Sequence, residues 1–77
     1  MLKEFLEFVI KALVDDPSEV SVVERINDRT SIFELTVAKS DIGKVIGKKG
    51  KTALALRTLL NAVSTKQGKR SELEIVE

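Results

Sequence analysis

The segment Val45-Ile46-Gly47-Lys48-Lys49-Gly50-Lys51-Thr52 is the most informative part of this chain. Two glycines enclose two lysines, an apolar pair precedes them, and a helix-like sequence follows. Because glycine has no Cβ atom, another backbone can approach it closely. A Gly-x-x-Gly turn at the start of a helix presents unpaired N–H groups at the positive end of the helix dipole, here beside two ammonium groups. This combination suits a phosphodiester backbone.

The basic residues are concentrated around this segment. Residues 39–70 hold nine Lys or Arg side chains and a single acid, Asp41, which gives them a net charge of +8. The other residues carry four basic and eleven acidic side chains, a net charge of −7. A basic middle in a nearly neutral chain indicates a local binding site for a polyanion. The alternative, a solvated helix face, is the usual explanation of a charge run, but it does not account for the glycine turn at its centre.

The size and composition of the chain restrict its possible functions. Its 77 residues make one domain, residues 1–77. A domain of this size buries about 60% of its unfolded surface, so its stability is marginal and a partner chain is one means of raising it. Since there is no Cys and no His, we expect no disulfide, no metal, no cofactor and no enzyme activity. The charged N-terminus predicts neither a signal peptide nor a membrane span, and the absence of Cys fits a cytoplasmic protein.

The apolar pattern predicts the element order α-β-β-α-α-β. Spacing at i, i+3, i+4 and i+7 indicates amphipathic helices, and β-branched or alternating runs indicate strands. The short gap between the first two strands predicts an antiparallel hairpin. The expected elements are a helix over 2–13, strands over 20–26 and 32–37, a short helix up to 46, a longer helix over 52–66 and a last strand around 73–75.

Several residues in these elements carry more specific expectations. Phe8 lies at the edge of the apolar stripe of the first helix, so it belongs either to the core or to a contact with a partner. Ser40 or Asp41 is expected to N-cap the short helix. Gly43 is expected to let that helix pack closely against its neighbours. One apolar face of the longer helix is expected to enter the core, comprising Ala53, Leu56, Leu59, Leu60 and Val63.

With a hairpin before it and a basic helix after it, the Gly47-x-x-Gly50 turn resembles the loop of a K-homology (KH) domain, which clamps about four backbone nucleotides of a single strand. The resemblance covers essentially the whole chain. The first helix and the last strand resemble the type II topology. The implied fold is α+β: a single type II KH domain with a three-stranded sheet and helices packed on one face.

In more detail, the chain resembles the KhpA (YlqC-like) family of small bacterial KH proteins. The similarity lies in residues 11–15, 43–50, 57–60 and 68–70, whereas residues 61–65 are more polar than the Ala-rich run expected there. The resemblance implies binding of cellular RNA and the role of an RNA chaperone. It also implies a homodimer, or a heterodimer with a second KH protein, KhpB (also called Jag or EloR), in control of cell length and envelope growth.

The loop residues are the first candidates for RNA binding. The backbones of Gly47 and Gly50 would approach phosphates, and Lys48 and Lys49 would supply positive charge. The start of the following helix would add N–H groups.

Three flanking residues complete the candidate site. Lys44 and Lys51 would reach neighbouring phosphates, and Ile46 would either form part of an aliphatic groove floor for bases or belong to the core. The chain has only three aromatic residues, so it lacks the exposed stacking platform of an RRM. We therefore expect modest base selectivity.

Dimerisation alone and nucleotide binding are two alternatives to RNA binding. The chain would be a dimerisation subunit of a KH complex, with little RNA binding of its own, if the lysine loop were vestigial. Gly50-Lys51-Thr52 matches the end of a Walker A nucleotide loop, but that loop requires a glycine at position 45, where this chain has Val45.

Overall fold

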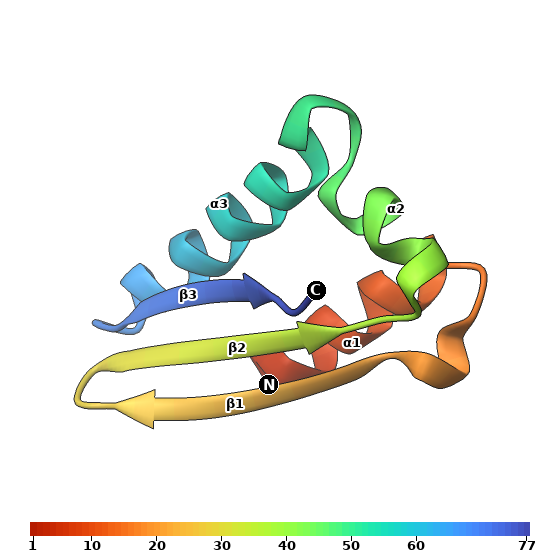
Figure 1. Cartoon of the computed structure of the whole chain (residues 1–77). Helices are drawn as coiled ribbons and strands as arrows, with labels where there is room; N and C mark the ends of the chain where they lie inside the picture. The colour runs from red at the N-terminus through yellow and green to blue at the C-terminus, as the bar shows by residue number, and fades with distance from the viewer.

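Strands from the two halves of the chain form one sheet, and the segment between them is helical (Figure 1). The computed structural model describes residues 1–77. It confirms the expected α+β fold and the order α-β-β-α-α-β. The helices are α1 (Leu2–Leu13), α2 (Ile42–Ile46) and α3 (Lys51–Lys66), and the strands are β1 (Ser21–Asn27), β2 (Thr30–Thr36) and β3 (Arg70–Ile75).

The sheet is mixed, with the strand order β1-β2-β3. β1 and β2 form the expected antiparallel hairpin, in which Val22 lies opposite Leu35. β2 and β3 are parallel, and Phe33 lies opposite Leu73. Parallel neighbours require a crossover connection. α2 and α3 supply that crossover. Because β2 precedes α2 and β3 follows α3, the turn between the two helices is connected to the sheet on both sides.

One face of the sheet packs against the helices, and its side chains form a single core. Alternate strand residues point to this face. The core contains Leu6, Ile10, Val14, Val22, Phe33, Leu35, Val37, Val45, Leu56, Leu60 and Leu73. The opposite face carries ion pairs: Arg25 pairs with Glu34 at 3.2 Å and with Glu74 at 3.9 Å. None of the helices has the length and apolar composition needed to cross a bilayer.

The prediction for the apolar face of α3 is only partly correct. Ala53, Leu56 and Leu60 are buried as expected, and Ser64 continues the same line. Leu59, however, is 52% exposed, and Val63 is also exposed. Successive side chains of a helix point about 100° apart around its axis. The narrow three-stranded sheet therefore covers one line of side chains along α3 and leaves the neighbouring line in solvent.

Phe8 does not belong to the core. Its side chain is 75% exposed on the outer side of α1, where Phe5 is also exposed. The inner side of α1 instead contributes Leu6 and Ile10, which are fully buried. Of the two interpretations of Phe8, the structure therefore excludes the core.

Candidate nucleic-acid interface

Gly47 ends α2 in a conformation that only glycine adopts readily. Its φ is 79° and its ψ is 171°. Its N–H group donates to the carbonyl of Gly43 at 2.9 Å. A Cβ atom on Gly47 would lie 2.6 Å from the Cβ of Thr52 and 2.8 Å from its backbone nitrogen. Gly47 therefore permits both the turn and the close approach of α2 to the first turn of α3.

The next residues form a single 3-10 turn, Lys48–Gly50, which projects both lysines into solvent. Lys49 has a φ of 57°, unusual for a residue with a side chain, and Gly50 follows with a φ of 75°. The N–H group of Gly50 donates to the carbonyl of Gly47 at 3.1 Å and closes the turn. Such sparsely populated backbone conformations cluster at ligand-binding sites.

The space in front of Gly50 is open. A Cβ atom built there would meet nothing within 4 Å. α3 begins at the next residue, and no side chain caps its N-terminus. The first N–H groups of a helix have no partner inside the helix, and they attract anions. The turn therefore leads directly into an uncapped helix start.

The cations of this turn are unpaired. The ion pairs of the structure involve only the N-terminus, Arg25 and Lys44. The ammonium groups of Lys48, Lys49 and Lys51 are exposed and have no carboxylate partner. The structure therefore places three uncompensated positive charges at the turn and at the start of α3.

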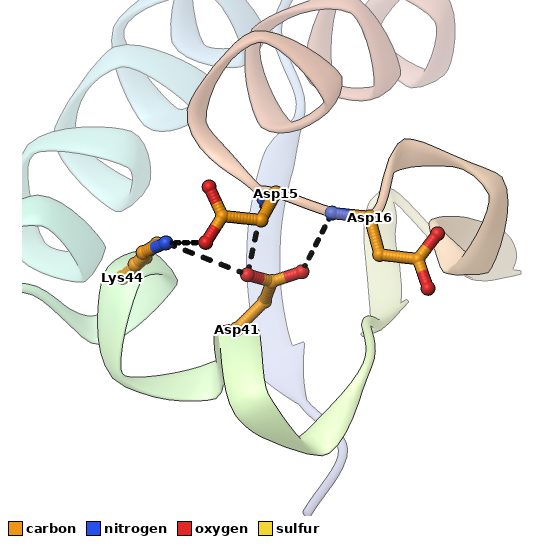
Figure 2. Close-up of polar contacts among 4 residues, drawn as sticks. All are labelled: Asp15, Asp16, Asp41 and Lys44. Atoms are coloured by element: carbon orange, nitrogen blue, oxygen red, sulfur yellow. Dashed lines mark hydrogen bonds and ion pairs between the residues drawn. The ribbon is translucent and has the colours of Figure 1, made fainter.

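Lys44 differs from these three lysines. Its ammonium group pairs with the carboxylate of Asp15 and lies 3.9 Å from that of Asp41 (Figure 2). The hydrogen bond to Asp15 raises the pKa of Lys44 above its ordinary value. This cation flanks the loop as the sequence predicted, but its charge is already matched within the protein.

Asp41 is fully buried, and its carboxylate has a role that its sequence position did not reveal. One oxygen accepts the backbone N–H group of Asp15 at 3.1 Å, and the other accepts that of Asp16 at 3.0 Å (Figure 2). Asp41 does occupy the N-cap position of α2, but its side chain makes no capping hydrogen bond there. The predicted N-cap hydrogen bond from the Asp41 side chain is therefore wrong. The carboxylate instead joins α2 to the segment that follows α1.

The expectation that Gly43 permits close packing is also wrong. A Cβ atom at this exposed position in α2 would meet nothing within 4 Å. Gly43 lies one turn before Gly47, so both glycines are on one side of the short helix. Ile46, next to the loop, is half-buried and so offers part of its side chain to a ligand.

A separate shallow groove lies between α3 and the outer edge of β3, and it is lined by Arg57, Asn61, Ser71, Glu72, Leu73 and Glu74. Its volume is about 300 Å³. Arg57 donates from Nη2 to the carbonyl of Leu73 at 3.4 Å, and Asn61 accepts the N–H group of Ser71 at 3.3 Å. The aromatic residues contribute nothing here, because Phe33 is buried in β2 and the other two lie on α1.

A mixed three-stranded sheet whose helical crossover carries a Gly-x-x-Gly turn is the architecture of a KH domain. The family model described as "KhpA/KhpB, KH domain" matches residues 3–75. The chain belongs to this family, and the resemblance seen in the sequence is confirmed.

Individual relatives are similar over nearly their whole length. The RNA-binding protein KhpA of Chlamydia pneumoniae is 53% identical over 76 residues, which cover 99% of this chain and 97% of the relative. The RNA-binding protein KhpA of Clostridium acetobutylicum is 47% identical over 75 residues, covering 97% of this chain and 100% of the relative. The RNA-binding protein KhpA of Aquifex aeolicus is 47% identical over 76 residues, which cover 99% of this chain and 96% of the relative. No solved structure matches the chain significantly.

Proposed function

We propose that this protein binds single-stranded RNA through the Gly47–Gly50 turn. The observation that carries the proposal is the combination of a glycine-bounded turn, an uncapped helix start and three unpaired cations, Lys48, Lys49 and Lys51. Phosphate oxygens would accept hydrogen bonds from the backbone N–H groups while the ammonium groups neutralise their charge. The relatives named above are RNA-binding proteins, which supports this assignment.

The flanking residues have secondary roles in the proposed site. Ile46 contributes the exposed part of its side chain to the wall against which a base packs. Lys44 acts first through its ion pair with Asp15, which fixes the helix before the loop, and contributes less charge than the loop lysines. Because no aromatic side chain lies in α2, the turn or α3, contacts to the bases would be aliphatic and modestly selective.

The direct test replaces Lys48 and Lys49 by Asp. Both side chains are exposed, so the double variant keeps its fold and thermal midpoint while its affinity for single-stranded RNA collapses. The matched control is Lys3→Asp with Lys11→Asp, which makes the same change in net charge on α1. RNA titration and a thermal melt on each protein give the result. Unchanged RNA binding by a folded loop variant would falsify the proposal.

We further propose that the protein works as a dimer, with itself or with a KhpB-like KH protein, as an RNA chaperone in the cytoplasm. The proposed process is post-transcriptional control of cell length and envelope growth. Two exposed apolar surfaces support a dimer: one side of α3 with Leu59 and Val63, which are one helical turn apart, and the outer side of α1 with Phe5 and Phe8.

The same surfaces favour a second candidate function, in which the chain is mainly a dimerisation subunit. The loop variant separates the two functions, because only RNA binding depends on Lys48 and Lys49.

A further inference from the structure

A second basic surface lies at the end of the molecule opposite α2, where two turns meet (Figure 1). One turn joins β1 to β2, and the other joins α3 to β3. Between them is a groove of about 570 Å³ without an apolar residue. This far-end groove is lined by Asp28, Arg29, Thr30, Thr65, Gly68, Lys69 and Arg70.

The positions of these residues are fixed by the backbone. The N–H group of Arg70 donates to the carbonyl of Arg29 at 2.9 Å, which ties the two turns together. Lys69 donates its backbone N–H group to the carbonyl of Ser64 at 2.8 Å. Asp28 and Gly68 take left-handed conformations, with φ of 59° and 73°, that reverse the chain at each turn. The three cations are therefore brought together by the fold itself.

The groove has a net positive charge. Arg29, Lys69 and Arg70 form no ion pair, and Asp28 is the only acid in the lining. Arg25, on the same sheet, does pair with two carboxylates. Like charges held side by side repel and destabilise a sheet. A fixed, polar groove with a net positive charge is suited to an anion with several charged oxygens.

We propose that the far-end groove is a second phosphate-binding site, which holds the backbone of an RNA strand that also occupies the Gly47–Gly50 turn. This inference rests on the proposed function of that turn. The 16 residues of α3 separate the two sites, a distance of about 24 Å at 1.5 Å per residue. A Gly-x-x-Gly loop clamps about four nucleotides, so the far-end groove would be reached only by a longer strand.

The test compares two lengths of unstructured single-stranded RNA, five and twenty nucleotides. The variant is Arg29→Gln, Lys69→Gln and Arg70→Gln in one chain. It leaves the backbone bonds between the two turns in place. The matched control is Lys3→Gln, Lys11→Gln and Lys39→Gln, which removes the same charge at other exposed or half-exposed positions. Affinities are measured at several salt concentrations, with a thermal melt to verify folding.

We expect the triple variant to bind the five-nucleotide RNA as the wild type does and the twenty-nucleotide RNA about tenfold to fiftyfold more weakly at physiological salt. The slope of log K against log salt for the long RNA should become shallower by about 2, for three lost phosphate contacts. The control variant should keep both values close to those of the wild type.

Three outcomes would overturn the inference. Equal loss on the short and long RNA, or equal loss in the control, would show a general effect of net charge. Wild-type affinity of the folded triple variant for the long RNA would show that the groove serves another ligand, such as an acidic protein surface. Failure of the wild type to bind either RNA would instead contradict the proposed function, and this inference with it.

Discussion

The buried carboxylate of Asp41 accepts the backbone N–H group of Asp16 at 3.0 Å, across a separation of 25 residues. Its other oxygen accepts the N–H group of Asp15. These bonds connect the chain that leaves α1 to the residue that precedes α2. Since α2 ends at the glycine turn, the orientation of the proposed RNA-binding loop depends on a contact with the segment that follows α1.

Replacing Asp41 by Asn is expected to lower the free energy of unfolding by about 1.5–3 kcal/mol, because an amide offers one carbonyl oxygen to two N–H groups and loses the charge assistance. Asp41→Ala should cost at least as much. Urea denaturation gives the values. Asp16→Asn is the control, since that carboxylate is exposed and accepts only from the hydroxyl of Ser18. A wild-type midpoint for Asp41→Asn would contradict this structural role.

The ion pair of Lys44 predicts a pH dependence. Because Asp15 raises the pKa of Lys44 in the folded protein, folding favours the ammonium form. The stabilisation is complete below the ordinary value of 10.5 and is lost as the pH rises through the folded value. The stability difference between the wild type and Lys44→Gln should therefore shrink between pH 8 and pH 11.5. Urea midpoints at both pH values measure it, and a constant difference would rule out the pair as its source.

Gly43→Ala is expected to stabilise the protein and weaken RNA binding. Alanine in the open space of α2 should raise stability by roughly 0.5–1 kcal/mol, since glycine loses more backbone entropy on folding. The added methyl group would obstruct a ligand that approaches this side of α2. Thermal melts and RNA titrations test both effects. Gly47→Ala should lose stability instead, through its clash with Thr52. Stabilisation without any loss of affinity would remove Gly43 from the interface.

Binding of a short RNA should depend strongly on salt. Three or four phosphate contacts at the turn predict a slope of log K against log salt of about −2 to −3. Lys48→Gln with Lys49→Gln should make the slope shallower by about 1.4. The measurement is a titration of a five-nucleotide RNA at several salt concentrations. A slope near zero would mean that uncharged contacts dominate.

Self-association is expected at micromolar concentration, most simply as a two-fold dimer, because each exposed apolar surface loses contact with water when it pairs. The interface is expected to avoid the Gly47–Gly50 turn, because covering the turn would block the RNA. We place the interface on α3, where Leu59 and Val63 are exposed one helical turn apart on the same side. Leu59→Glu should then give a monomer in sedimentation velocity, and Phe8→Glu should leave the dimer intact. The reverse result would move the interface to α1. A monomeric wild type would exclude the homodimer, and a heterodimer with a KhpB-like protein would remain as the proposed assembly.

The features that follow from neighbouring residues could be predicted from the sequence. The spacing of the hydrophobic residues predicted the bounds of α1 and β1 to within one residue, and the spacing of the glycines predicted the position of the turn. The groups that depend on distant partners could not be predicted. Lys44 and Asp15 are 29 positions apart, and Arg29 joins Arg70 only after the sheet has formed. The exposure of Leu59 also depends on how much of α3 the sheet covers.

The parallel pairing of β2 with β3 makes the Gly47–Gly50 turn part of a connection rather than a detachable motif. Thr30 lies beside Arg70, and every residue of the turn lies between them in the chain. A peptide of residues 40–66 would contain all the charges of the turn but neither of the strands that hold α2 and α3 at their angle. Grafting this segment into another protein would therefore transfer its composition without its geometry, unless the host offered two parallel strands at the same spacing.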